Sequence, residues 1–416
     1  MKNARILWVC NIKPAIVSEI LGQPQNCFGG WLNTMSKELL NMGNDLLIMY
    51  PDSIEIKGEE DSLRYCSFLE HDCLTRFSSV IEEFRPEVVH IWGTEYRHAY
   101  ECMQACEKLN LTMYCVISIQ GLVSLYGEYH YMEGLPSNVI RKRTLRDILK
   151  KSGIRHEKET FCKRGELETA ALKICRHVIG RTEWDYAALR RVNPFAEYHF
   201  CNETLREVFY KKNWDISKID KYRIFVSQCN YPIKGFHYLL QAMPDILSKY
   251  PKTHIYTTGK NLVGLSWGQK MRLTSYQLYL SQLIEKYGLQ KNISFLGTLS
   301  ADQMCEQYLK ANVFVSPSTI ENSSNSVGEA MLLGCPVVSS NVGGINNLLK
   351  HGMEGYIYQS SAPYMLAYYV NKVFDDDNNA LQMSHNAMQR AQVTHNREKN
   401  IRDLCAIYDS IINREI

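Results

Sequence analysis

Two carboxylates that lie eight positions apart mark the segment of the chain with the clearest chemistry. Glu321 and Glu329 flank a run of Asn, Ser and Gly that follows a short apolar stretch, residues 312–316. We expect that stretch to be a strand and expect a helix over 325–333, so that Glu321 lies in the loop between them. Ligands of open α/β sheets bind at this edge, and free backbone N–H groups at a helix N-terminus suit hydroxyl or phosphate groups. Two acids beside such donors indicate a site for a sugar nucleotide.

This segment resembles the E-x7-E signature of retaining glycosyltransferases of family 4, which have the GT-B fold. The similarity continues through 334–344 and 351–356, which look like that family's next strand, Gly-Gly turn and loop, and it includes 295–297 and 234–235 upstream. It covers essentially the whole carboxyl half and, more loosely, the amino half. The resemblance implies an α/β fold of two Rossmann-like, doubly wound domains that face each other across a cleft. It also implies a C-terminal helix that crosses back to the amino domain.

In that family the two acids of the signature have different roles. By resemblance, Glu329 accepts hydrogen bonds from the ribose hydroxyls of the donor, as a carboxylate can. Glu321 lies nearer the sugar, where it binds a hydroxyl or stabilises developing positive charge, and we expect it to be catalytic. Backbone and polar groups between the acids are expected to complete the donor pocket: Asn322, Ser323, Ser324, Asn325 and Ser326.

Lys234 follows an expected strand and resembles the family's phosphate-binding lysine, so we expect it to bind the donor and to be catalytic. Gly235 beside it fits a close approach of a phosphate; the alternative is a surface lysine before a helix. Six residues earlier, where the family usually has arginine, this chain has Gln228. A neutral amide cannot make the bidentate, charge-assisted contact of a guanidinium. We therefore expect that another cation compensates or that activity is weak or absent.

Two glycines in the amino half precede an expected helix. Phe28-Gly29-Gly30-Trp31 resembles the family's Gly-Gly loop, whose backbone amides approach the donor phosphate. Turns use glycine for backbone reasons alone. The place of Gly29 and Gly30 after the first strand and before a helix nevertheless suits an anion.

Three further residues are candidates for the same cleft. Gln120 stands where the family commonly has a histidine near the reacting sugar, and we therefore count it among the catalytic residues. An amide can bind a sugar hydroxyl but cannot shuttle a proton. His90 ends the preceding strand and either lines the cleft or is a structural hydrogen-bonding residue. Arg181, in a segment similar to a recurrent element of bacterial polysaccharide transferases, points into the cleft or lies on the surface beside a helix cap by Thr182.

Length and composition limit the class of protein. At 416 residues the chain predicts two domains of about 200 residues each. A net charge of +3 gives no reason to expect a nucleic acid partner. The 14 cysteines are scattered in apolar patterns with no zinc-type spacing, and neither a signal peptide nor a membrane span is evident. We expect a cytoplasmic protein with reduced thiols.

Strand patterns alternate with helical patterns along the chain, which is typical of parallel sheets with crossover helices. Beside the strands named above, the expected strands are 5–10, 45–50, 88–92, 113–119, 177–180, 222–228, 254–258, 293–296 and 337–339, and the expected helices include 31–42 and 398–413.

The two series of strands predict the domain boundaries. We expect an N-terminal, acceptor-binding domain over 1–208, with a basic insertion at about 120–165, and a C-terminal, donor-binding domain over 222–395. Residues 209–221 are the expected linker, and 396–416 are the helix that packs back on the N-terminal domain.

The expected insertion is rich in positive charge. Ten Lys/Arg residues lie against three acids from Asn138 to Gly165, and tyrosines precede them. Such a segment can contact an anionic membrane surface or a phosphorylated acceptor; the alternative is a solvated helix face.

The triplet Asp375–Asp377 has the Asp-x-Asp spacing of metal-dependent transferases. We interpret it as a solvated helix end, and so expect no metal and no cofactor.

The leading hypothesis is a metal-independent, retaining glycosyltransferase of the hexosyltransferase type. Its donor is a UDP- or GDP-linked sugar, and its acceptor is a glycan or lipid-linked glycan of a bacterial surface polysaccharide, made in the cytoplasm or at the inner face of the membrane. A nucleotide-sugar 2-epimerase of the same architecture and a catalytically silent nucleotide-sugar binding subunit are the alternatives. The sequence leaves the base, the sugar and the linkage open.

Overall fold

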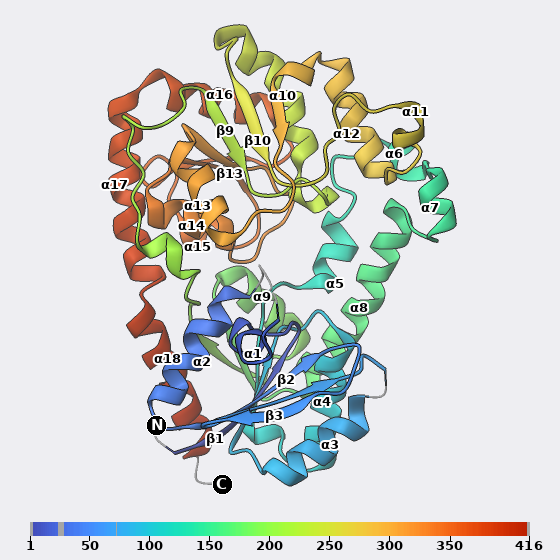
Figure 1. Ribbon diagram of the computed structural model, residues 1–416, viewed down its shortest axis with the longest axis vertical. Coiled ribbons are helices and arrows are strands. Elements are labelled where there is room, and N and C mark those ends of the chain that lie inside the picture. Colours follow the sequence, from blue (N-terminus) through green and yellow to red (C-terminus); the bar gives the residue numbers. More distant parts are fainter. Residues whose placement is uncertain (1–2, 24–28, 72, 414–416) are drawn as a thin grey trace. The chain divides into compact units, whose positions relative to one another are not determined.

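The chain folds into two α/β units. The computed structural model describes residues 3–23, 29–71 and 73–413, and Figure 1 follows the chain through them. The first unit comprises Met1–Ser124, Lys163–Glu207 and His395–Ile416, and the second comprises Leu125–Cys162 and Val208–Thr394. Each unit therefore contains segments that are distant in sequence.

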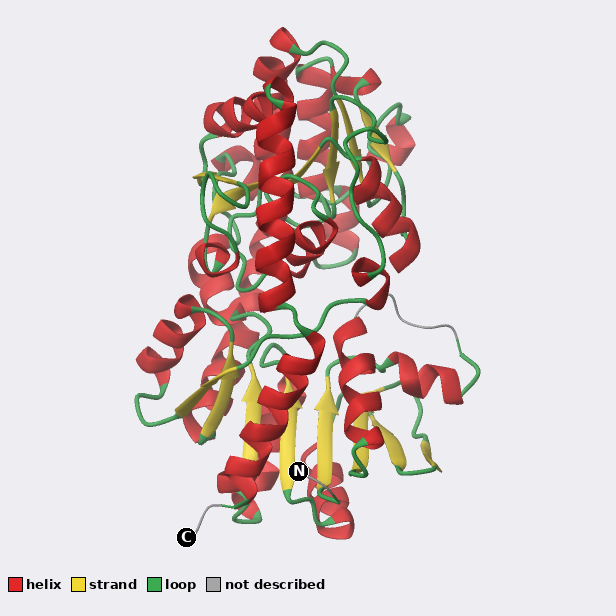
Figure 2. Cartoon of the chain, turned by 90° about the vertical axis from the view of Figure 1, so that its left-hand side faces the viewer, coloured by secondary structure: helices red, strands yellow, loops and turns green. Residues whose placement is uncertain are grey.

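The first unit is built on an eight-stranded sheet whose central strands run parallel, with their carboxyl ends at one edge (Figure 2). Its first strand is buried at almost every position, as expected for a parallel strand covered on both faces. In sheet order the strands are β3 (Lys57–Glu60), β4 (Leu63–Phe68), β2 (Asp45–Pro51), β1 (Arg5–Cys10), β5 (Val88–Trp92), β6 (Cys115–Ser118), β7 (His177–Gly180) and β8 (Glu197–Phe200).

The last helix of the chain completes the core of the first unit. Ile401, Leu404 and Ile411 on α18 (Arg397–Ile412) pack with residues of β1, and the Trp8 indole donates to the Tyr408 hydroxyl at 3.0 Å. The other helices that lie wholly in this unit are α1 (Ala15–Ile20), α2 (Gly30–Asn41), α3 (Cys73–Phe84), α4 (Arg97–Lys108) and α9 (Glu183–Val192).

The second unit contains a six-stranded sheet in which every pairing between described strands is parallel. In sheet order the strands are β11 (Ile293–Phe295), β10 (His254–Thr257), β9 (Arg223–Val226), β12 (Val313–Ser316), β13 (Val337–Asn341) and β14 (Tyr356–Gln359). The helices from β9 onward are α10 (Phe236–Lys249), α11 (Trp267–Lys270), α12 (Ser275–Lys286), α13 (Ala301–Lys310), α14 (Asn325–Leu333), α15 (Ile345–Leu348), α16 (Pro363–Asp375) and α17 (Asp377–Thr394).

These two parallel sheets confirm the predicted α/β class with two doubly wound, Rossmann-like domains. The expected strands all form, some shorter by one to three residues. Sequence patterns missed the antiparallel pair of β3 with β4, because β3 is a charged and largely exposed edge strand. They also missed the short strand β8, which has no fully buried residue.

The basic segment differs from the prediction in the unit to which it belongs. We expected an insertion in the N-terminal domain, but Leu125–Cys162 groups with the second unit. It forms α5 (Val123–Leu125), a π-helical turn over Tyr126–His130, α6 (Ser137–Arg141), α7 (Leu145–Leu149) and the first part of α8 (Ile154–Ile174). This placement is explained by hydrogen bonds that join the segment to loops and helices of the second unit, for example at Thr319 and Ser275.

The expected linker is also part of the second unit. Phe209 is fully buried, and the Trp214 indole donates to the Ala311 carbonyl at 2.7 Å. Hydrophobic burial thus fixes this segment in place, although its weak periodicity gave no helix or strand signal. None of the helices within the described ranges is both long and apolar enough to span a bilayer.

Candidate functional site

The site of the second unit lies where the order of its strands reverses. The chain builds the sheet outward from β9 in one direction and from β12 in the other, so that the loops after these two strands diverge at their carboxyl ends and leave room for a ligand. Lys234 comes from the loop after β9, and Glu321 comes from the loop after β12. The topology therefore brings together Lys234 and Glu321, two of the three residues that the sequence analysis named as catalytic, whereas the third, Gln120, belongs to the first unit.

Lys234 and Glu321 form a partly buried ion pair. The lysine Nζ lies 2.7 Å from the glutamate Oε1, and the exposed fractions of the two side chains are 26% and 12%. The Ser318 hydroxyl donates to the same carboxylate oxygen at 2.8 Å. A cation, a carboxylate and a hydroxyl thus converge at one point, and the ammonium group can turn to an entering phosphate while Ser318 keeps the carboxylate oriented.

Close backbone packing sets the positions of both loops. Gly235 has φ of +61°, and a Cβ there would lie 1.8 Å from the Pro317 carbonyl oxygen, so only glycine lets the two loops meet. Gly343 is similar, because a Cβ there would lie 1.9 Å from the Glu321 carbonyl oxygen, and the Gly344 N–H donates to that oxygen at 3.0 Å. The loop that carries Glu321 is therefore packed closely at Pro317 and again at Glu321.

Helix α14 follows directly and begins at the predicted residue. Its N-cap is Ser324, whose side chain makes no capping hydrogen bond and instead lies 3.1 Å from the Ser326 hydroxyl. The Tyr308 hydroxyl donates to the Ser326 carbonyl at 3.1 Å. Glu329 lies on the second turn of this helix and is only 4% exposed, and Asn322 in the preceding loop is also buried. Ser323 and Asn325 are partly exposed.

A pocket of about 560 Å³ opens at the carboxyl ends of β9, β10 and β11. Its volume is within the range of small-molecule sites. Asn230 and Pro232 of the Lys234 loop line it, together with Gly259, Lys260 and Gly297, which follow β10 and β11. Gln228 is partly exposed at the start of the same loop, and its side chain has no hydrogen bond to another described residue.

In the first unit, the Gly-Gly turn packs on the loop that follows β1. Gly29 has φ of +72°, and a Cβ there would lie 2.2 Å from Ile12 Cδ1. A Cβ on Gly30 would lie 2.6 Å from Arg206 Cγ. Gly30 is the first residue of α2. Phe28, the residue before this turn, lies outside the described residues.

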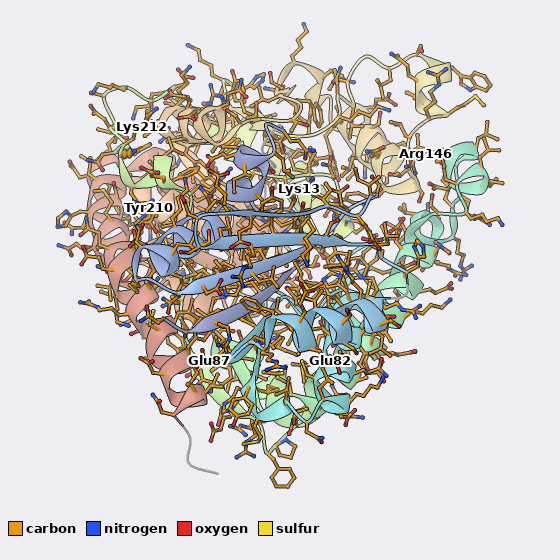
Figure 3. All side chains as sticks on the ribbon, turned by 60° about the horizontal axis from the view of Figure 1, so that its bottom comes forward. Lys13, Glu82, Glu87, Arg146, Tyr210 and Lys212 are labelled. Atoms are coloured by element: carbon orange, nitrogen blue, oxygen red, sulfur yellow. The ribbon has the colours of Figure 1, made fainter. Side chains whose placement is uncertain are left out.

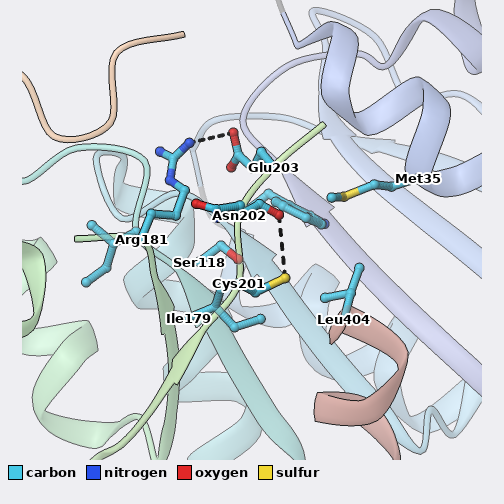
Figure 4. A pocket seen from close by; sticks show the side chains of 10 residues that line it. Met35, Ser118, Ile179, Arg181, Cys201, Asn202, Glu203 and Leu404 are labelled. Carbon is cyan, nitrogen blue, oxygen red and sulfur yellow. Dashed lines mark hydrogen bonds and ion pairs between the residues drawn. The ribbon is translucent and has the colours of Figure 1, made fainter. Parts of the chain in front are cut away.

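Gln120 and Arg181 are held by one acid, Glu203, that the sequence analysis missed. The Arg181 guanidinium lies 2.8 Å from the Glu203 carboxylate, as Figure 4 shows, and also donates to the Gln120 carbonyl at 3.3 Å. The Gln120 amide donates to the same carboxylate. Arg181 is only 5% exposed, so the alternative that it lies on the protein surface is wrong. Thr182 does cap α9, as that alternative predicted. A cavity of about 10 Å³ beside this cluster has room for one water molecule at most.

His90 has the environment of a structural histidine. It is fully buried, with Nδ1 at 2.5 Å from the Tyr408 hydroxyl and Nε2 at 2.7 Å from the Ser118 hydroxyl. Its ring stacks on Trp92. Burial lowers the pKa of His90 to about 3, so the imidazole is neutral. These contacts favour the structural alternative for His90 over a place in a ligand site.

Glu95 is a second acid that the sequence analysis missed. It follows β5, and the order of strands in the first sheet reverses between β1 and β5. Burial raises the pKa of Glu95 to about 7, with the nearby Glu168 carboxylate adding to the effect. A perturbed carboxyl group at a switch point is typical of functional sites. The sequence offered one signal for Glu95, which is its position shortly after the apolar strand β5.

Two groups of side chains bear on metal binding. Asp375 Oδ1 lies 2.5 Å from Lys249 Nζ, and Asp377 Oδ1 lies 2.5 Å from Lys221 Nζ, so the first and third acids of the triplet are each paired with a lysine. In the first unit, one ligand atom each from His177, Glu197 and His199 lie within 4.8 Å of one another, and this set could hold a metal ion. It was not foreseen, because the three residues meet only through the pairing of β7 with β8.

Part of this chain is similar in sequence to known glycosyltransferases. Residues 208–390 match the family model for glycosyl transferases group 1. An uncharacterized glycosyltransferase of Methanocaldococcus jannaschii is 28% identical over 185 residues, which are 44% of this chain and 43% of that protein. A D-inositol 3-phosphate glycosyltransferase of Corynebacterium urealyticum is 26% identical over 179 residues, or 43% of this chain and 41% of that protein. The chain spans less than half the length of these curated relatives.

Solved structures extend the similarity of fold to both units. Sucrose-phosphate synthase from Thermosynechococcus elongatus has a TM-score of 0.70 at 15% identity, covering 98% of this chain and 99% of that one. HepE of Anabaena, solved in complex with UDP-glucose, has a TM-score of 0.69 at 14% identity, covering 98% of this chain and 100% of that one. Residues 208–390 thus match the glycosyl transferases of group 1, and the chain as a whole has the fold of the GT-B glycosyltransferases.

Proposed function

We propose that the protein is a retaining glycosyltransferase of family 4 that uses a UDP- or GDP-linked sugar. The observation that carries this proposal is the Lys234–Glu321 pair, which lies at the switch point of the second sheet beside the N-terminus of α14. Positive charge there would meet the diphosphate, and the carboxylate would lie near the sugar. Preorganised charges of this kind supply most of the stabilisation in transfer reactions.

The remaining residues of the second unit fit the binding of a nucleotide. Glu329 is a buried acceptor on α14, and buried carboxylates suit the paired hydroxyls of a ribose. The polar loop Asn322–Ser326 and the pocket beside it would enclose the rest of the donor. In the mechanism that we propose, the acceptor hydroxyl attacks from the side on which the nucleotide leaves, and the departing phosphate takes its proton. No metal ion or other cofactor takes part in this mechanism.

We further propose that the acceptor is a glycan or lipid-linked glycan, used for a bacterial surface polysaccharide. The first unit would bind it, with Glu95 and the Arg181–Glu203 pair among the polar groups of that unit. The Gly29–Gly30 turn would approach the donor phosphate. The supporting argument is the likeness of the polar segments to the family, together with the switch point at β1 and β5.

We also propose a contact with the inner surface of the membrane through α7. Leu145, Ile148 and Leu149 are 47%, 55% and 73% exposed on this short helix. Lysines and arginines of the segment 138–165 surround them in the sequence. Exposed apolar side chains flanked by positive charge favour the interface of a membrane with anionic lipids.

Glu329→Ala tests the assignment of the nucleotide site. We expect it to weaken binding of the preferred nucleoside diphosphate by about 1.5–3 kcal/mol, because hydrogen bonds to a charged acceptor are lost. The measurement is isothermal titration calorimetry, preceded by a thermal-shift screen of UDP, GDP and their sugars. An unchanged dissociation constant, in a variant with a native circular dichroism spectrum, contradicts the assignment. Incubation with donor alone separates transfer from 2-epimerisation, since an epimerase needs no acceptor.

A further inference from the structure

The basic segment Leu125–Cys162 forms one wall of the pocket at the carboxyl ends of β9–β11. Tyr131, Arg146 and Glu157 line this pocket together with residues that follow the strands of the second sheet. A segment that precedes the whole carboxyl half in the sequence therefore borders the proposed donor site.

Helix α7 is fixed to this unit through a buried acid. Asp147 has no exposed surface, and its carboxylate accepts the backbone N–H of Ser275 at 2.9 Å, at the first residue of α12. The Thr144 hydroxyl, which caps α7, donates to the Leu273 carbonyl at 2.7 Å. A carboxylate at a helix N-terminus is stabilised by the helix dipole. Asp147 thus anchors α7 beside the pocket.

The start of the segment is held at the catalytic loop itself. The Thr319 hydroxyl, two residues before Glu321, donates to the His130 carbonyl at 3.2 Å. The Glu133 carboxylate accepts from Ser360 at 3.2 Å and from Ser361 at 3.1 Å. Both ends of the wall are therefore attached to the rest of the second unit by hydrogen bonds.

Among the described residues that line the pocket, one basic residue comes from this segment. Of the ten basic residues over 138–165, Arg146 lines the pocket, and Figure 3 shows it on α7. Within the described part of the chain, the partners of its guanidinium are Ser152 Oγ at 3.4 Å and Asp147 Oδ1 at 3.6 Å, both at long distance, and its side chain is 39% exposed. Lys260, after β10, is the second cation of the pocket, and Glu157 is its acid. Gln228, in the loop beside them, is neutral.

We propose that Arg146, together with Lys260, binds the phosphate groups of the donor nucleotide and supplies the cationic contact that Gln228 cannot make. A guanidinium has the donors and the permanent charge for this task. The backbone anchors of α7 hold Arg146 at the pocket before a ligand arrives, which reduces the entropic cost of the contact. This inference rests on the proposed function, since it concerns the same donor.

The test compares two variants that each remove one positive charge from the segment. Arg146→Gln should weaken binding of UDP or GDP, whichever the wild-type chain binds, by about tenfold, or about 1.4 kcal/mol. It should also reduce the dependence of the dissociation constant on salt. Binding of the uncharged nucleoside should change by less than about twofold, because no phosphate is present. Arg155→Gln is the control, since Arg155 is exposed on α8 and does not line the pocket.

Two further variants and the possible outcomes complete the experiment. Lys260→Gln should behave as Arg146→Gln does, and Arg146→Lys should restore part of the affinity. Equal affinities for Arg146→Gln and wild type, or an equal loss for nucleoside and nucleoside diphosphate, overturn the inference but leave the proposed function standing. Failure of the wild-type chain to bind any nucleoside diphosphate overturns both.

Discussion

At the scale of single residues, the most informative contact is the ion pair of Lys234 with Glu321. The sequence places the two residues 87 positions apart, and the structure brings them to 2.7 Å. In the absence of a phosphate the lysine is neutralised by the acid, so that no isolated charge is left in a partly buried site. A donor diphosphate would exchange one anionic partner for another, which keeps the cost of opening the pair low.

Lys234→Ala should therefore reduce both nucleotide affinity and turnover. The lysine is the main cation at the switch point, and losing its charge-assisted bond removes stabilisation of the leaving diphosphate. Initial-rate kinetics and calorimetry measure the two effects. Lys212→Ala is the matched control, because Lys212 forms a more exposed ion pair in the same unit, with Glu306 at 2.6 Å, and it should leave both values within about twofold.

Gln228→Arg tests the departure from the family pattern. If Gln228 faces the diphosphate, an arginine there should tighten binding, because a charge-assisted pair is about twice as strong as a neutral one. Turnover can fall even so, since binding that is equal in the ground and transition states does not speed the reaction. Unchanged affinity and salt dependence, with Lys234→Ala impaired, would show that this loop is misaligned with the family.

At the scale of elements, α7 combines two different faces. Asp147 fixes it to α12, whereas Leu145, Ile148 and Leu149 are exposed at i, i+3 and i+4 positions, which lie on one side of a helix. An exposed apolar face on an anchored helix is costly in water unless another surface covers it.

Leu149→Ser should weaken binding to vesicles that contain anionic lipid by about tenfold or more, because burial of a leucine stabilises by about 1.5–3 kcal/mol. Sedimentation with phosphatidylglycerol vesicles measures it. Val393→Ser is the control, because Val393 is 63% exposed on α17 and lies outside the basic segment. Equal sedimentation of Leu149→Ser and the wild type argues against a membrane contact through α7.

At the scale of the whole molecule, the proposed transfer reaction uses side chains and backbone groups of the protein and no metal ion. Asp375 and Asp377 are each paired with a lysine, and Lys234 can provide charge to the phosphates. Turnover should accordingly persist in excess EDTA. If EDTA abolishes transfer and Mn²⁺ restores it, the interpretation of Asp375–Asp377 as a helix end is wrong.

Acid stability is a second property of the whole molecule. Burial lowers the pKa of His98 to about 4, and His90, His237 and His395 shift in the same direction. The unfolded chain, with a histidine pKa near 6.5, then binds more protons than the native state. The contribution of His98 to the free energy of unfolding is present above pH 6.5 and is lost as pH falls toward 4.

His98→Phe should reduce the slope of unfolding free energy against pH between about 4 and 6.5, by up to about 1.4 kcal/mol per pH unit. The ring packs between Phe68 and Tyr96, so phenylalanine suits the site. Urea unfolding at several pH values measures the slope. A variant whose slope equals that of the wild type would show that His98 is not held neutral by burial.

The sequence by itself determined the fold class and the parts of the site that are local. Helix α14 was predicted to the residue and strand β12 to within one residue, with Glu321 in the loop between them, because an apolar run, a polar loop and a helix start follow one another in consecutive positions. The same holds for β1 and β5, which are continuous apolar runs. Residue types at these positions also indicated sugar nucleotide chemistry.

Only the tertiary structure decided which distant residues share a site. The pairing of Lys234 with Glu321 and of Arg181 with Glu203 depends on strand order, which a linear pattern does not encode. The basic segment was assigned to the wrong half, because its hydrogen bonds to Thr319 and Ser275 join residues more than a hundred positions apart. Periodicity reports which face of an element is buried, but it carries no information about the partner that buries it.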